Sequence, residues 1–270
     1  MKFAATLAVI LVFSLWSSAV AAGRTPTTSA KSPIVLSKSD AASIGQKIWK
    51  NECGGTVSGL TSWNKGEYFA SLGIGHFIWY PAGVSGPFEE SFPPLIDFMK
   101  SRKVMMPRWV ANTKDCPWKT KAQFDAAKSS AQMNELRKFL HATIPHQTEF
   151  IFYRLQNALP KMLRSAPRGD QQTINARFRA VAGTSLGVYA LMDYVNFKGE
   201  GTNPKERYKG QGWGMLQVLQ EMKGMPTGLA ASKEFGVAAE RVLRRRVQNA
   251  PKDESRWMAG WRNRTLTYRP

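Results

Sequence analysis

The sequence is poor in the residues that bind metal ions. It contains only two cysteines, Cys53 and Cys116, and three scattered histidines, His76, His141 and His146. Metal sites in proteins need clustered His, Cys or carboxylate ligands at short spacings. We therefore expect no metal site and no cofactor, which argues against zinc-dependent amidases and endopeptidases. The two cysteines would permit one disulfide in an oxidising compartment, but the sequence does not show whether they meet.

Acidic residues are also scarce. Asp and Glu together number 19, against 38 Lys and Arg, which gives a formal net charge of +19. A charge of this size indicates a polyanionic partner, such as nucleic acid, an acidic membrane surface or the bacterial cell wall. The alternative is a charge that only keeps the protein soluble.

Long apolar runs are missing after the N-terminus. Lys2 precedes the apolar run 3–16, which is shorter than the roughly 20 residues of a membrane-spanning helix. Small residues then lead to an expected cleavage point after Ala21. Export makes nucleic acid the least available partner, and we expect a periplasmic or secreted monomer without stable membrane insertion. The expected segments are a signal peptide over residues 1–21, a flexible Ser/Thr/Pro-rich leader over 22–36 and one folded domain over 37–270.

The rest of the pattern is typical of an α+β fold that is mostly helical. Residues 63–80 are rich in aromatics and glycine and alternate in polarity, which predicts a small β-hairpin or sheet near the N-terminus. Amphipathic segments on both sides predict a helical body. Helices are expected over residues 40–52, 93–102 with Ser91 as the cap, 122–128, 131–142, 145–165, 170–181, 185–197, 213–222, 232–249 and 254–263.

Glu52 is the first candidate for a catalytic residue. It follows Ile48 by four residues and Ile44 by eight, so helical spacing places its carboxylate on the apolar face of the first helix. A carboxyl group desolvated there holds its proton near neutral pH. A glycosidase needs such a group to protonate the departing glycosidic oxygen. The alternative is a helix-end glutamate that turns to solvent or pairs with an arginine.

Several segments resemble phage-type lysozymes, in the order in which those enzymes carry them. Ser-Leu-Gly-Ile-Gly-His at 71–76, after a helix that ends in Glu, is similar to the Thr-Ile-Gly-x-Gly-His of their active-site lobe. Residues 190–201 (ALMDYVNFKGEG) resemble their central helix and its exit, and residues 215–219 (MLQVL) resemble the helix that follows. Residues 257–264 (WMAGWRNR) resemble their W-x-x-G-L-x-N-R ending.

A longer part of the chain resembles a group of exported proteobacterial lysozyme-like proteins, which includes a predatory bacterium's lysozyme directed at deacetylated peptidoglycan. The shared strings are NECGG, GLTSWNKGE, FASLGIGHFIWYP, DYVNFKGEG and ERYKGQGWGMLQVL. The resemblance implies a lysozyme-like catalytic domain over residues 37–270 and a muramidase, a glycosidase that cleaves peptidoglycan. It also implies Glu52 as the catalytic acid, peptidoglycan glycan strands as the partner and deacetylated peptidoglycan as a candidate substrate.

The second catalytic group departs from the phage pattern. Those enzymes carry an aspartate six residues before the motif's Thr, where this chain has Lys65. Glu67 is the only acidic residue between the first helix and the motif. In an extended strand Glu67 and Ser71 share a face and could activate water, as an inverting hydrolase requires. Otherwise Glu67 lies exposed beside Gly66. Without a second carboxylate, the sugar's own C6 hydroxyl attacks and the enzyme is a lytic transglycosylase.

Other residues are candidates for binding the sugar. Glycines in the motif indicate close approach of the backbone to substrate or to another element. His76 fits a structural partner at the strand better than an acid or a base. Aromatic and amide side chains supply the stacking and hydrogen bonding that sugars need, with ordinary packing as the alternative for each. The substrate-binding candidates are Gly73, Gly75, His76, Tyr194, Asn196, Tyr208, Gln211 and Trp213.

Two further patterns carry less weight. Residues 183–187 match G-x-S-x-G, but a nucleophile elbow needs a strand before the serine and a histidine after it, and neither is expected here. The arginine run 244–246 is interpreted as a solvated helix face. Three classes remain: a cell-wall glycosidase, a non-catalytic glycan-binding protein on the same fold, and a cationic membrane-active or partner-inhibiting protein. Glu52 together with the Gly-His motif favours the glycosidase.

Overall fold

The computed structural model describes residues 34, 36–86 and 88–270 of the chain. The predicted signal peptide and almost all of the predicted leader lie outside these residues, so both stay predictions. The described residues belong to one unit, Ile34–Pro270.

Helices dominate the described residues, and the expected α+β, mostly helical class is confirmed. The α-helices are α1 (Lys38–Cys53), α2 (Phe92–Ser101), α3 (Arg108–Asn112), α4 (Lys121–Ala126), α5 (Ala131–Ala142), α6 (Ile144–Ser165), α7 (Gln171–Ala182), α8 (Ser185–Lys198), α9 (Met215–Glu221), α10 (Gly228–Asn249) and α11 (Ser255–Leu266). The 3-10 helices are η1 (Ser58–Leu60), η2 (Ala127–Ser129) and η3 (Arg168–Asp170). The strands are β1 (Thr61–Ser62), β2 (Ala70–Leu72), β3 (Phe77–Trp79), β4 (Arg207–Tyr208) and β5 (Gln211–Gly212).

Helix α1 has clear sequence causes for its start and its end. The Ser37 side chain caps it by accepting a hydrogen bond from the Asp40 amide at 3.0 Å. Ile44 and Ile48, whose spacing predicted the helix, are buried. Gly54 ends the helix with a φ of 62°, in the left-handed region that favours glycine. The predicted first helix is confirmed with slightly wider bounds.

The predicted β segment over residues 63–80 is a small antiparallel sheet of order β1-β2-β3. Ser71 lies opposite Ser62 on β1 and opposite Ile78 on β3. Strand β1 comes before the segment where strands were expected. The chain between β1 and β2 forms a loop that turns at Gly66, which has a φ of 87°.

The other expected helices are present with shifted ends. Helix α9 begins at Met215 rather than Trp213, because the Gln217 side chain accepts a hydrogen bond from the Gly214 amide at 3.0 Å. Helix α3 and strands β4 and β5 were not predicted, because such short elements show no clear hydrophobic period.

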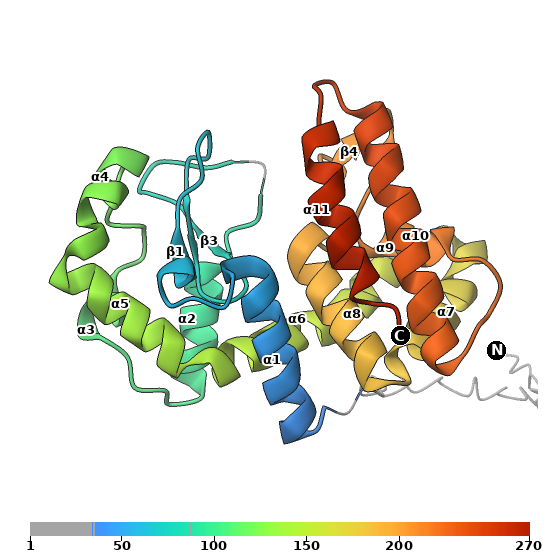
Figure 1. The fold of residues 1–270 in the computed structure, drawn as a ribbon, viewed down its shortest axis with the longest axis horizontal. Coiled ribbons are helices and arrows are strands. Elements are labelled where there is room, and N and C mark those ends of the chain that lie inside the picture. Colours follow the sequence, from blue (N-terminus) through green and yellow to red (C-terminus); the bar gives the residue numbers. More distant parts are fainter. Residues whose placement is uncertain (1–33, 35, 87) are drawn as a thin grey trace, which may run out of the picture. The chain divides into compact units, whose positions relative to one another are not determined.

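Helix α6 connects two groups of elements (Figure 1). Helices α1 and α2 pack against it with the three-stranded sheet, while α7 and α8 pack against it with the C-terminal helices. Gln147 of α6 is fully buried and accepts a hydrogen bond from the Ile74 amide at 2.8 Å. This bond ties the turn between β2 and β3 to the helix that carries both groups.

Two sequence patterns have a plain structural outcome. The G-x-S-x-G match lies between α7 and α8, so no strand precedes the serine, as expected. The arginine run on α10 was expected to be a solvated face, and this is wrong for Arg246. That side chain pairs with Glu254 at 2.8 Å and lies over the Trp213 ring at 4.1 Å. Within the described ranges, no helix combines the length and apolar character needed to cross a bilayer.

Candidate active site

Glu52 lies in the last turn of α1 and points into the unit, as its spacing from Ile48 predicted. Ile48, one turn earlier, is fully buried, and the Glu52 side chain is 12% exposed. Gly54 turns the chain away directly afterwards. The carboxylate is therefore held at a helix end that packing has fixed.

An ion-paired chain surrounds this carboxylate. Arg264 of α11 places Nη2 2.5 Å from Glu52 Oε1, and its Nε lies 2.6 Å from Asp193 Oδ2 on α8. The Arg264 guanidinium also lies 4.0 Å from the Phe197 ring centroid. One guanidinium thus bridges two carboxylates and connects α1, α8 and α11.

The turn between β2 and β3 brings further residues next to the Glu52 carboxylate. His76 Nδ1 lies 3.6 Å from Glu52 Oε2. Asn196 of α8 donates from Nδ2 to Glu52 Oε1 at 3.3 Å and to the Gly75 carbonyl at 3.2 Å. His76 has a φ of 47°, an unusual conformation for a non-glycine residue, which is common at functional sites. We call Glu52, His76, Asp193, Asn196 and Arg264 the Glu52 cluster.

The protonation expected for Glu52 is not supported. Burial raises the pKa of Glu52, as the sequence argument assumed. The attraction of Arg264 and His76 and the hydrogen bonds from Arg264 and Asn196 outweigh that effect, and they hold the pKa below its ordinary value. The sequence could not reveal this, because Arg264 is 212 residues away along the chain. The ion pair with Arg264 favours the ionised form of Glu52, so the alternative of pairing with an arginine is the one observed.

Asp193 holds Arg264 in place from the buried side of the Glu52 cluster. It is fully buried and accepts hydrogen bonds from Arg264, from the Tyr268 hydroxyl at 2.5 Å and from Asn51 at 3.3 Å. Burial alone would lower the pKa of Arg264, but Asp193 and Glu52 raise it well above its ordinary value. The guanidinium is therefore a permanent positive charge next to Glu52.

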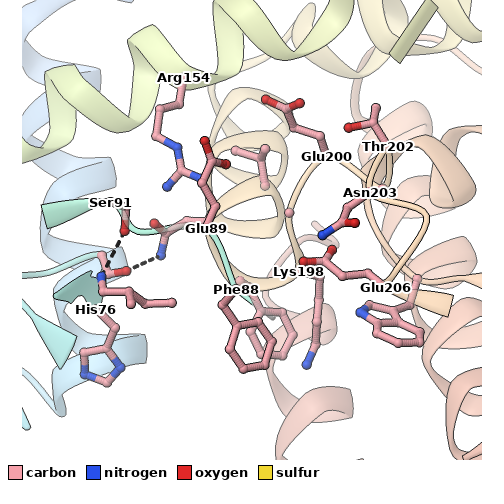
Figure 2. A pocket seen from close by; sticks show the side chains of 18 of the residues that line it. His76, Phe88, Glu89, Ser91, Arg154, Lys198, Glu200, Thr202, Asn203 and Glu206 are labelled. Carbon is pink, nitrogen blue, oxygen red and sulfur yellow. Dashed lines mark hydrogen bonds between the residues drawn. The ribbon is translucent and has the colours of Figure 1, made fainter. Parts of the chain in front are cut away.

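A cleft of about 350 Å³ adjoins the cluster. His76 and Asn196 lie on its wall, and both contact Glu52, which is not itself among the residues that line the cleft. The aromatic rings of Phe88, Phe197 and Trp213 form part of the wall, and Figure 2 shows the labelled side chains that surround the space. A cleft of this size with aromatic and polar walls fits a sugar unit.

Carboxylates from two loops also line the cleft: Glu89, Glu200 and Glu206. Burial raises the pKa of Glu206, helped by repulsion from Glu89, although Asn203 and Arg246 oppose the change. The cleft therefore contains a carboxyl whose pKa is shifted in the direction opposite to that of Glu52.

A lysine lies between aromatic rings at the same cleft. Lys198 Nζ is 4.0 Å from the Phe197 ring centroid and 3.9 Å from that of Trp261. Burial lowers the pKa of Lys198 well below its ordinary value, and Arg246 and Arg264 lower it further. The aromatic faces attract the charged form of this half-buried lysine and so oppose the effect of burial.

The two motif glycines are required by close packing against other elements. A Cβ on Gly73 would lie 2.3 Å from Gln147 Oε1, and Gly73 has a φ of 69°. A Cβ on Gly75 would lie 2.6 Å from the Phe77 ring and 2.8 Å from Asn196 Oδ1. The expected close approach of the backbone is confirmed. Gly73 approaches α6, and Gly75 approaches α8 and β3. Gly75 also lines the cleft.

The pairing proposed for Glu67 and Ser71 is not formed. Glu67 lies in the loop before β2, where it accepts a hydrogen bond from Asn64 at 3.1 Å. Ser71 is 4% exposed within β2. Because the strand begins only at Ala70, the count by twos does not apply. Glu67 lies beside the Gly66 turn, as the alternative expected, but its side chain is half-buried rather than exposed.

The other candidates divide between the cleft and the rest of the unit. Asn196 and Trp213 line the cleft. Tyr194 is fully buried and donates to the Trp213 carbonyl at 2.8 Å, so its assignment to substrate binding is wrong. Tyr208 and Gln211 are not on the cleft wall: Tyr208 donates to Glu254 at 2.9 Å, and Gln211 lines a separate hollow.

Several residues of the site were not predicted from the sequence. Asp193 and Arg264 stand inside the segments 190–201 and 257–264 that carry the resemblance, which was the available signal. Glu206 is the first residue of the shared string ERYKGQGWGMLQVL, which was its available signal. Arg154 and Glu89 stand outside the quoted segments, and only the packing of α6 and the loops brings them to the cleft.

Cys53 and Cys116 are both free and buried, so the structure contains no disulfide between them. The Cys53 thiol donates to the Gly73 carbonyl at 3.4 Å. Burial raises the pKa of each thiol to about 12. Neither cysteine is therefore an activated nucleophile.

The chain matches no protein-family model, and no curated protein or solved structure is significantly similar to it. Among the described residues, no group of three or more His, Cys, Asp and Glu side chains could hold a metal ion. A functional assignment therefore depends on the Glu52 cluster, the adjoining cleft and the sequence resemblance.

Proposed function

We propose that the chain is an exported muramidase, a glycoside hydrolase with a lysozyme-like fold that cleaves the glycan strands of peptidoglycan. The observation that carries this proposal is the position of Glu52. It lies in the last turn of a helix, pairs with Arg264 on α11 and contacts His76 and Asn196, which line a sugar-sized cleft.

Glu52 protonates the glycosidic oxygen in this proposal while the bond from that oxygen to the anomeric carbon breaks. In the resting protein Arg264 and His76 keep it ionised. A glycan that fills the cleft excludes water, which strengthens the burial effect that raises the pKa of Glu52. We therefore expect kcat, which reports the pKa values of the glycan complex, to rise as the pH falls from 7 towards 5, and a pH–rate profile at saturating substrate checks this. A profile that falls towards acid would contradict a proton-donating Glu52.

Water then attacks the anomeric carbon and gives a reducing end. Glu206 is the cleft carboxyl proposed to accept the proton from this water, in place of the pair expected from Glu67 and Ser71. Lytic transglycosylation is a second candidate, favoured by the loop position of Glu67 and the burial of Ser71. It would leave anhydro ends instead.

The positive charge supports the same proposal. At a net charge of +19, attraction concentrates the protein on an acidic cell-wall polymer and speeds encounter with it. A periplasmic or secreted monomer acting on glycan strands, acetylated or deacetylated, fits this chemistry.

Release of fragments from purified sacculi tests the function. We expect the wild type to solubilise sacculi and Glu52→Gln to retain binding but release no fragments. Glu149→Gln is the matched control, because Glu149 lies on α6 away from the cleft wall and is 42% exposed. Co-sedimentation without any release by the wild type would instead indicate a non-catalytic glycan-binding protein. Salt-sensitive binding to anionic vesicles alone would indicate a membrane-active protein.

A further inference from the structure

A second hollow continues from the cleft along α6. Its volume is about 500 Å³, and it shares Glu89, Ser91, Arg154 and Glu200 with the cleft. Because these residues line both spaces, a ligand in the cleft could extend a branch into the hollow. We call this second space the α6 groove.

One face of α6 forms the floor of the groove. Arg154, Asn157, Lys161 and Arg164 are three or four residues apart, which places them along one side of the helix. Tyr153 also lines the groove and is 49% exposed. The groove thus offers cations, an amide and an aromatic ring to the same ligand.

Arg154 differs from the other arginines of the site, Arg246 and Arg264. Figure 2 shows it reaching down from α6 to the space beside Glu89. Arg264 and Arg246 are ion-paired, whereas no described residue forms an ion pair or a hydrogen bond with Arg154. Burial lowers the pKa of Arg154, and Glu89 and Glu200 offset only part of this. A half-buried guanidinium that has lost water and gained no partner is prepared for an anionic ligand.

The charges around Arg154 indicate what kind of ligand fits. Lys161 is paired with Glu200 at 3.1 Å, so Arg154 and Arg164 are the cations left to a ligand, beside the exposed carboxylate of Glu89. A ligand with carboxylates and an amine on a short backbone would match this mixture.

We propose that the α6 groove binds the peptide stem attached to the glycan strand, with a carboxylate of the stem on Arg154. This rests on the proposed muramidase function, since it names the part of the same substrate that lies outside the cleft. The stem carries several carboxylates and an amine. A guanidinium binds a carboxylate through two parallel hydrogen bonds, which fixes both position and direction.

Kinetics on two glycans test the proposal: strands that carry their stems, and the same strands after amidase has removed the stems. The quantity to compare is the ratio of kcat/KM on stem-bearing strands to that on stem-free strands. We expect Arg154→Gln to lower this ratio about tenfold, mainly through KM on stem-bearing strands. Arg164→Gln, at an exposed position that lines only the groove, should lower it about threefold. Lys138→Gln, an exposed charge on α5, is the control and should leave the ratio unchanged.

An unchanged ratio in Arg154→Gln overturns the proposal, as does an equal loss on both strands, which would assign Arg154 to the cleft alone. If Arg154→Gln fails to fold, Arg154→Lys and Arg164→Gln give the same comparison.

Calorimetry with the isolated stem tetrapeptide separates this proposal from the proposed function. We expect the wild type to bind the peptide and Arg154→Gln to bind it about tenfold more weakly. A wild type that cleaves neither glycan but binds the peptide through Arg154 would overturn the proposed function and keep the groove. A wild type that does not bind the peptide overturns the groove, whatever its activity.

Discussion

Glu52 and Glu206 belong to the same site but have different surroundings. Glu206 lines the cleft, whereas Glu52 contacts the lining residues His76 and Asn196. Glu52 ends a helix and touches Arg264, Asn196 and His76. Glu206 lies in the loop before β4, with Glu89 close enough to repel it. Burial raises the pKa of both carboxyls, yet the pKa of Glu52 is lowered overall and that of Glu206 is raised.

The difference shows that burial alone does not set the charge of a carboxyl. A direct ion pair with a guanidinium decides the direction for Glu52, and the weaker influence of Arg246 fails to do so for Glu206. In the free protein these two directions are opposite to the proposed roles, since an acid needs the higher pKa and a base the lower one. The proposed division therefore requires the bound glycan to raise the pKa of Glu52 above that of Glu206.

The same substitution at both positions gives the largest expected effect. We expect Glu52→Gln to lower kcat on sacculi roughly a thousandfold, the scale of general acid catalysis. Glu206→Gln should lower it about tenfold, because bulk water can still accept the proton in place of Glu206. Initial rates of fragment release measure both. The reverse order would make Glu206 the principal catalytic group and break the comparison.

Removal of the Asp193 charge, which holds Arg264 next to Glu52, should lower the free energy of unfolding. Asp193→Asn leaves a buried arginine with one carboxylate instead of two, so we expect a loss of about 3 kcal/mol in the free energy of unfolding. Asp170→Asn, at an exposed position that accepts one hydrogen bond from Gln220, should cost less than about 0.5 kcal/mol. Urea unfolding measures both, and equal losses would show that the buried ion pairs do not hold this end of the cleft.

The sequence predicted well those features of the Glu52 cluster that depend on residues close together in the chain. The spacing from Ile48 placed Glu52 on the inner face of α1, and the glycines around His76 indicated a tightly packed turn. Both features depend on residues that are neighbours in the chain.

The contacts between residues far apart in the chain could not be predicted from the sequence. The guanidinium that changes the charge of Glu52 comes from α11, and its position depends on how α8 and α11 pack. Tyr194 was misassigned because α8 is buried on nearly all sides, so its sequence offers no apolar stripe to separate core from cleft. Glu67 was misplaced because the Gly66 turn delays the start of β2.

Two of the predicted binding residues, one aromatic and one amide, test where the binding surface of the cleft ends. Trp213 lines it and Gln211 does not. We expect Trp213→Leu to raise KM about fivefold, the effect of losing one stacking surface, and Gln211→Ala to leave KM unchanged. Saturation curves on soluble glycan fragments measure the two values, and a larger effect at Gln211 would move the binding surface towards β5.

The smallest expected effect is on the pH dependence of stability. A lowered pKa means that the ion pair of Glu52 stabilises the fold above pH 4.5 and is lost as the pH falls through the folded-state pKa. The Tm advantage of the wild type over Glu52→Gln should therefore shrink from pH 7 to pH 3.5. A raised pKa has the opposite sign, so the wild type should gain relative to Glu206→Gln over the same range. Thermal scans measure these shifts, and parallel curves would refute the opposite pKa directions.

Mass spectrometry of the material released from sacculi shows whether Glu52 cleaves the glycan. We expect muropeptides with reducing ends from the wild type and none from folded Glu52→Gln. Anhydro ends would replace hydrolysis with transglycosylation. Equal release by the two proteins, or none by the wild type, would contradict the claim that Glu52 cleaves the glycan.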